Sequence, residues 1–235
     1  MDSVNQTNMN VIDLSKTPLR EVNSRLQKLP KDTNERLWKL VNVHGEHACA
    51  VGLTQPIEVR IEGHIGYYCG GMNQQATIVV NGQCGVGLAE NIMSGEVRVK
   101  GNASAAAGAT GQGGLIVIEG DAGTRCGISM KGVDIVVGGS VGAMSAFMAQ
   151  AGSLVVCGDA GANLGDSLYE ARIYVQGKVE SLGADCVEKK MTPHHLAKLE
   201  KLLKRAGISA DPSRFKRYGS ARRLYNFHVD NVDAY

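Results

Sequence analysis

The chain has 235 residues, 43% of them hydrophobic, which is the composition of a protein that buries a core, and it has neither a collagen repeat nor an apolar run long enough to cross a membrane. Glycine is abundant at 30 residues, whereas one Trp, seven Tyr and three Phe make up the aromatic residues, so small and β-branched side chains must fill the core. A net charge of +2 argues against a nucleic-acid-binding protein, although basic residues outnumber acidic ones by 11 to 5 in residues 187–235.

The N-terminal segment, residues 1–39, is predicted to be a helical cap. It begins without a basic flank and apolar run, so we expect no secretory signal and a cytoplasmic location. Thr17 is expected to cap a helix whose first residue is Pro18 and whose pattern ends at Pro30. The helix would carry one apolar face, formed by Leu19, Val22, Leu26 and Leu29.

A repeat of 19 residues without any insertion dominates the middle of the chain. Its mark is a column of glycines: Gly63, Gly82, Gly101, Gly120, Gly139, Gly158 and Gly177. Each glycine follows a short strand-like segment, such as EVRIE before Gly63, in which the residues two and four places before the glycine are always Val, Ile or Leu. A strand this short and a repeat without room for a crossover helix predict coils that stack on one another.

The second half of each repeat is also patterned. The residue after the glycine is polar in every copy, the next is apolar, and the seventh is Gly or Ala. We expect the glycine column to form corners, where unusual backbone angles and close coil contacts both demand glycine. The sequence therefore predicts a mainly β protein, a right-handed parallel β-helix of seven coils over residues 40–190. A degenerate first coil is expected at residues 40–52, with Val41, Val43, Gly45 and Gly52 in the matching places but offset by one residue from exact register.

Residues 191–235 are predicted to hold a C-terminal helix and a basic, aromatic tail. Thr192 and Pro193 repeat the cap-and-proline start, and Gly207 ends the helix. Its apolar stripe consists of Leu196, Leu199, Leu202 and Leu203. The helical flanks would cover the open ends of the coil stack, which otherwise promote polymerisation.

The repeats show no pattern typical of a catalytic, cofactor-binding or metal site. The outward strand column is half aliphatic, which indicates that another segment or a partner covers it. Glu62, Lys100 and Glu119 are interpreted as solvated charges, and the glycine-rich turns recur too regularly to be phosphate loops. The pairs His44/His47 and His194/His195 lack ligand spacing, and the six cysteines, which never occur as C-x-x-C, are interpreted as packing residues.

One segment stands out as a candidate partner interface. Met144, Phe147 and Met148 occur in a turn where other copies have Arg, Ile, Asn or Ser, and we predict that they dock on a partner together with tail residues. Those tail residues are Arg222, Arg223 and Tyr225. The alternative is that Phe147 packs under a terminal helix while the tail straps the rod.

The pattern G-x-x-G-x-x-x-G, present as GDAGTRCG (120–127) and GDAGANLG (158–165), resembles the C-terminal GXGXG β-helix domain of glutamate synthase. It is also similar to the β-helical chain of formylmethanofuran dehydrogenase. The flanking motifs REVN (20–23) and FKRYGSARRLYNFHVDN (215–231) are most like the stand-alone β-helix subunit of N-methylglutamate synthase. The resemblance to the repeat family covers residues 40–186.

The resemblance implies a noncatalytic subunit in a complex that makes N-methyl-L-glutamate from methylamine and L-glutamate. It implies two partners, a glutamine amidotransferase-like subunit and an FMN-binding glutamate synthase-like subunit. The FMN and iron–sulfur clusters would be on a partner and no cofactor on this chain, with neither nucleic acid nor membrane as partner. Three alternatives remain open: a glutamate synthase that uses ammonia or glutamine, the formylmethanofuran dehydrogenase, and a self-assembling β-helical scaffold.

Overall fold

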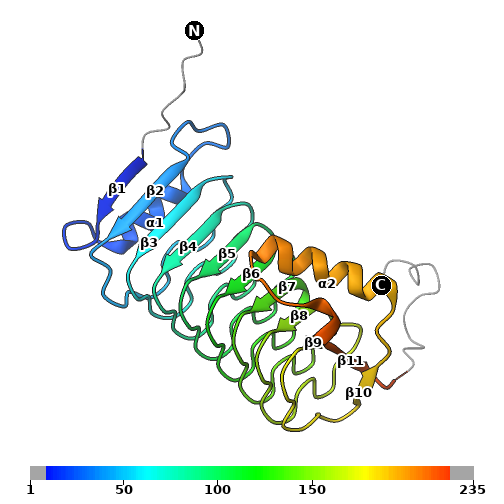
Figure 1. The fold of residues 1–235 in the computed structure, drawn as a ribbon. Coiled ribbons are helices and arrows are strands. Elements are labelled where there is room, and N and C mark those ends of the chain that lie inside the picture. The colour runs from blue at the N-terminus through cyan, green and yellow to red at the C-terminus, as the bar shows by residue number, and fades with distance from the viewer. Residues whose placement is uncertain (1–8, 223–235) are drawn as a thin grey trace.

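The computed structural model describes residues 9–222, which form one β-helix with helical additions at both ends (Figure 1). One sheet contains eleven strands in the order β1-β2-β3-β4-β5-β6-β7-β8-β9-β11-β10, and the first nine are parallel to one another. The nine are β1 (Met9–Asp13), β2 (Leu37–Val41), β3 (Glu58–Glu62), β4 (Thr77–Asn81), β5 (Glu96–Val99), β6 (Leu115–Ile118), β7 (Lys131–Val137), β8 (Ala151–Val156) and β9 (Arg172–Val175). The predicted parallel β-helix is confirmed.

The inward columns of the repeat form the core. All fourteen Val, Ile and Leu residues two and four places before the corner glycines are fully buried. The opposite wall consists of single-residue bridges, not the short second strand that the pattern suggested. These bridges join equivalent residues of successive coils: Ile65, Cys84, Ala103, Ala122, Val141, Ala160 and Val179.

The segment after each bridge turns back through left-handed backbone at alternate residues. In the coil named by its corner residue Gly139, the left-handed residues are Met144 (φ 58°), Ala146 (φ 57°) and Met148 (φ 51°). The N–H groups of Met144 and Met148 donate to carbonyl oxygens of the following coil, at 2.8 and 2.9 Å. The N–H group of Ala146 donates to the preceding coil, at 2.7 Å. These bonds offset backbone strain of about 1–2 kcal/mol per non-glycine residue and tie each turn to both neighbours.

Of the two reasons predicted for the glycine column, unusual backbone angles and close contact between coils, the structure supports mainly the second. Of the seven corner glycines only Gly63 has a φ in the left-handed region, so the expectation of unusual backbone angles is wrong for the others. A Cβ on Gly139 would lie 2.1 Å from Asp121 Oδ1, and one on Gly158 would lie 2.5 Å from Ser140 Oγ. Close approach of the preceding coil therefore excludes a side chain at these corners.

The atoms that crowd the corners belong to a polar ladder. Asn102 Oδ1 accepts from Asp121 N at 2.8 Å, and Asp121 Oδ1 accepts from Ser140 N at 2.7 Å. Ser140 Oγ and Asp159 Oδ1 continue the pattern, accepting from the N–H of the residue 19 places later. The position after the glycine is polar because its side chain binds the backbone of the next coil.

The N-terminal end is closed by α1 (Leu19–Gln27), whose Val22 and Leu26 pack into the core. The predicted cap is wrong: the residue at the N-cap is Pro18, and no side chain caps the helix. The degenerate first coil is confirmed, but its register is not, since Trp38 and Leu40 pair with the inward residues of β3. Val41 and Val43, which were expected in the inward columns, follow those two residues; Val41 is half-buried, and Val43 is still part of the core.

The C-terminal flank covers the outer face of the sheet. The cap by Thr192 and the left-handed end at Gly207 of α2 (Pro193–Ala206) are confirmed. Together with the 3₁₀ helix η1 (Pro212–Arg214), α2 lies against the outward side chains of β6 to β9 (Figure 1). This contact buries Leu115, Val117, Val136, Val155 and Tyr174 under Leu199, Leu202, Leu203, Ala206 and Phe215.

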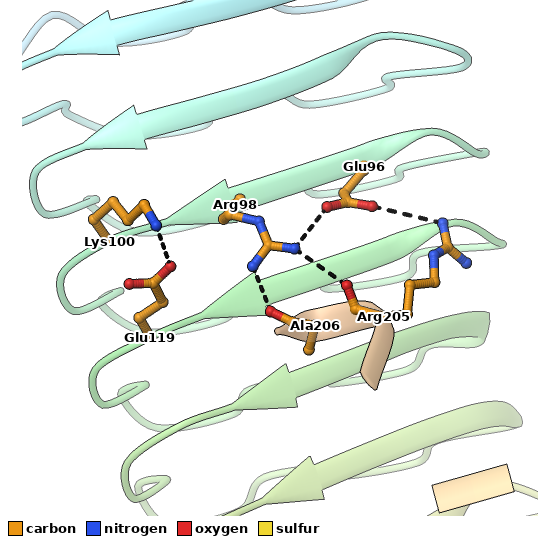
Figure 2. A network of polar contacts seen from close by, with 6 residues as sticks. All are labelled: Glu96, Arg98, Lys100, Glu119, Arg205 and Ala206. Carbon is orange, nitrogen blue, oxygen red and sulfur yellow. Dashed lines mark hydrogen bonds and ion pairs between the residues drawn. The ribbon is translucent and has the colours of Figure 1, made fainter. Parts of the chain in front are cut away.

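Polar contacts fix the end of α2 on the sheet (Figure 2). The Arg98 guanidinium donates to Ala206 O at 2.5 Å and to Arg205 O at 3.4 Å, and it pairs with Glu96 at 2.9 Å. The chain then returns as β11 (Lys216–Ser220), which lies antiparallel between β9 and β10 (Cys186–Lys189). The sheet thus extends into both segments predicted as flanks. In residues 9–222 no helix is long and apolar enough to cross a membrane.

Candidate functional site

Exposed hydrophobic side chains gather on the turns of the β-helix. We call the outward residues 4 to 11 places after each corner glycine the turn face. Five large hydrophobic residues on it are well exposed: Tyr67 57%, Met72 45%, Val86 39%, Met93 42% and Met148 41%. They span the coils from Gly63 to Gly139, about 19 Å at the usual spacing of stacked strands. The outer strand face differs because α2 covers much of it.

The predicted interface lies partly on this surface. Met148 is exposed, whereas Met144 and Phe147 are half-buried in the same turn. Arg222 is on the same side of the rod, because it forms an ion pair with Asp185 in the turn of the Gly177 coil. Backbone bonds from Met148 N to Asp166 O and from Ser167 N to Ala184 O connect that turn to Met148. Arg223 and Tyr225, the other two predicted residues, lie outside the described residues.

The alternative for these residues is only partly supported. The apolar cluster beneath α2 does not include Phe147, so this side chain is not among those packed under the C-terminal helix. The tail does strap the rod over part of its length, since β11 joins the sheet and Ala221 N donates to Asp185 O at 2.7 Å.

Most of the exposed apolar side chains were not singled out from the sequence. Tyr67 and Val86 occupy the fourth place after their glycines, where later coils have Ala, Thr or Ser. Met72 has the same place in its coil as Met148, the ninth, and alignment of the coils shows Asn, Thr or Ser between them. The sequence could have indicated these residues, because the same outward place of the repeat holds a large apolar residue in some coils and a small or polar residue in others. This contrast occurs in several turns, not only in the one that contains Met148.

The titratable groups of the rod are mainly structural. Burial raises the pKa of the Cys49 and Cys126 thiols to about 12, so they remain protonated, as expected for packing residues. His47 Nδ1 accepts from Tyr67 N at 2.9 Å, and its ring stacks on Tyr67 with 4.5 Å between the centroids. In residues 9–222 no three His, Cys, Asp or Glu side chains are grouped as metal ligands.

Charges that the sequence analysis interpreted as solvated are paired between coils. Lys100 Nζ lies 2.6 Å from a carboxylate oxygen of Glu119, and Lys39 Nζ lies 3.2 Å from one of Glu62. These pairs are partly exposed and contribute about 0–1 kcal/mol each. They do not converge on a cavity. The arrangement suits docking, because a rigid rod presents exposed apolar side chains on the turns of three of its coils.

Comparison with known proteins yields one informative match. A curated relative, protein GlxC of Rhizobium meliloti (strain 1021), is 58% identical over 228 residues, which cover 97% of this chain and all of the relative. No family model matches the chain. No solved structure matches it either.

Proposed function

This chain belongs to the same family as GlxC, and the match covers nearly its whole length. We propose that it is a noncatalytic subunit of a glutamate synthase-like complex, specifically of the N-methylglutamate synthase type. That complex joins methylamine and L-glutamate to give N-methyl-L-glutamate. This chain holds an amidotransferase-like subunit and an FMN-binding subunit in a fixed relation, and the FMN and iron–sulfur clusters belong to a partner.

The observation that carries this proposal is the apolar turn face. Four of the five exposed apolar side chains lie on two adjacent coils, those of Gly63 and Gly82, and apolar groupings of this kind favour contact with a partner. Three of the five are methionines, which adapt to irregular surfaces. The turns that display them are bonded to the coils on both sides, so the surface is rigid before any partner binds. Rigidity lowers the entropic cost of docking.

Co-expression with the two partner subunits tests this function. The variant M72S/M93S/M148S removes three exposed side chains from the turn face and is expected to release a partner while the isolated chain keeps its melting temperature. Wild-type chain should co-purify with both subunits and with flavin absorbance. Retention of both partners by this variant would contradict a docking role for the turn face.

A matched control comes from the ends of the rod. Met9 and Val11 on β1 and Val187 on β10 are the other exposed large hydrophobic residues in residues 9–222, and these two strands are the outer strands of the sheet. The variant M9S/V11S/V187S should keep both partners. If the isolated wild-type chain forms filaments that this control variant abolishes, the self-assembling scaffold replaces the proposed function.

A further inference from the structure

A polar cavity lies at the C-terminal end of the rod, over the outer face of the last strands. Its volume is about 270 Å³, and it is lined by the start of β9, by β11, by the end of β10 and by the first turn of α2. Its lining includes three cationic side chains and one imidazole: Arg172, Lys189, Arg217 and His195. A cavity of this size suits a molecule of a few heavy atoms.

The lining carries an excess of positive charge. Arg172, Lys189 and Arg217 line the cavity, against one acidic residue, Glu170, and the fourth cation of the lining, Arg222, is paired with Asp185. Within residues 9–222, Arg172 and Lys189 have neither a hydrogen bond nor an ion pair from their side chains. By contrast, the cations on the outer face of β2, β3 and β5 are each paired with a carboxylate.

Strand pairing brings these cations together. Arg217 is the register partner of both Tyr174 on β9 and Lys189 on β10, and paired residues point to the same face of a sheet. Arg217 donates to Lys190 O from Nε at 3.1 Å and from Nη2 at 3.0 Å, which fixes its guanidinium at the wall. The repulsion between guanidinium and ammonium groups on one face is relieved by an anion between them.

The space between these side chains exists because β11 has a glycine there. Gly219 lines the cavity, and its φ is outside the left-handed region, so its backbone does not require glycine. A Cβ at this position would lie 3.5 Å from Lys189 Cγ and 3.7 Å from Arg217 Nη1, which is ordinary contact. Folding therefore tolerates a side chain at this position. That side chain would, however, fill part of the cavity.

Two further polar groups lie in the charge environment of Arg172 and Arg217, and of these His195 lines the cavity. The Tyr174 hydroxyl is fully buried and has no hydrogen-bond partner in the described part of the chain, and its charge environment includes Arg172 and Arg217. Burial and the same two arginines lower the pKa of His195, whose Nδ1 is 2.6 Å from Thr192 Oγ1. The lowered pKa favours the neutral form of His195, which therefore lines the cavity as a polar ring rather than as a further cation.

We propose that this cavity binds a small anion through a carboxylate or phosphate group, with Arg172 and Arg217 binding its oxygen atoms and Lys189 adding charge. Guanidinium groups suit both kinds of oxyanion because their planar N–H groups can bind two oxygens at once. The inference is independent of the proposed function, since the isolated chain contains the whole cavity.

Isothermal titration of the full chain at low salt tests the site, with inorganic phosphate and succinate as separate probes. We expect at least one probe to bind with a Kd below about 1 mM, and the probe that binds identifies the oxyanion class. Arg172→Ala should weaken binding about tenfold or more, and Gly219→Val should abolish it without lowering the melting temperature. If Gly219→Val fails to fold, Gly219→Ala takes its place and should still weaken binding.

The control is Arg214→Ala, which removes an exposed arginine outside the cavity and should leave the affinity within about twofold. Three outcomes would overturn the proposal. They are a Kd above about 1 mM for both probes, unchanged binding in a folded Gly219 variant, and an equal loss in Arg172→Ala and Arg214→Ala, which would indicate general charge attraction.

Discussion

Replacement of Gly158 by alanine tests the physical basis of coil stacking. The new Cβ would lie 2.5 Å from Ser140 Oγ and 2.7 Å and 2.8 Å from the carbonyl carbon and oxygen of Gly139. Ser140 could rotate away, but it would then lose the bond that it accepts from Asp159 N at 2.9 Å. The backbone of Gly139 can yield only if the two coils separate, which disturbs the bonds on either side.

The expected cost follows from these two effects. Loss of a partly solvated hydrogen bond costs about 0.5–1.5 kcal/mol, and overpacking against a backbone costs about 1–3 kcal/mol. A total of about 2–4 kcal/mol corresponds to a melting temperature lowered by about 4–16 °C for a chain of this size. Far-UV circular dichroism during heating measures it.

Gly207→Ala is the matched control for this experiment. Gly207 ends α2 with a φ of 71° and has nothing within 4 Å of its would-be Cβ, so alanine meets backbone strain without a collision. Its cost should be about 1 kcal/mol. The reasoning is refuted if Gly158→Ala melts with the wild type, or if it is less damaging than Gly207→Ala.

Three other predictions concern the stability of the rod. Ser153→Ala should leave the melting temperature unchanged or raise it, because the buried Ser153 Oγ has no hydrogen-bond partner in residues 9–222, whereas Ser145→Ala loses a 2.8 Å bond to Gly142 O and should lower it. Arg98→Met should destabilise the chain by about 1–2 kcal/mol and make α2 more sensitive to protease, because the last carbonyls of α2 lose their donor; equal protease resistance would contradict this. The raised pKa of Cys126, about 12 against an ordinary value of 9.0, predicts that stability is fully present below pH 9 and falls as the pH rises from 9 towards 12, because the unfolded thiol ionises first. Denaturant titrations at pH 8 and pH 10.5, compared with Cys126→Ala, measure the difference, and an equal decline in both proteins would count against it.

The strand columns show why so much of the fold could be predicted. A period of 19 without insertion places every Val, Ile and Leu of the inward columns in register, so burial of one coil implies burial of all. The outward aliphatic column likewise predicted a covering segment, and α2 provides it. Such regularities depend on position in the repeat, which the sequence displays directly.

The corners and the first coil show where prediction failed. Gly139 was expected to need both unusual backbone angles and close coil contact; only the contact is found, and the sequence could not show that an Asp121 oxygen makes it. The register of β2 was missed because Trp38 and Leu40 pair 21, not 19, residues before their partners in β3. The cavity at Gly219 depends on an antiparallel strand that joins distant segments, which local patterns do not indicate.

The most direct test of the account is methylamine-dependent formation of N-methyl-L-glutamate by purified subunits. The chain alone should bind no flavin and form no product, the two partner subunits without it should be nearly inactive, and mixing all three should restore turnover. Product formation by this chain alone, or full activity of the partners in its absence, would contradict a noncatalytic subunit that holds the complex together.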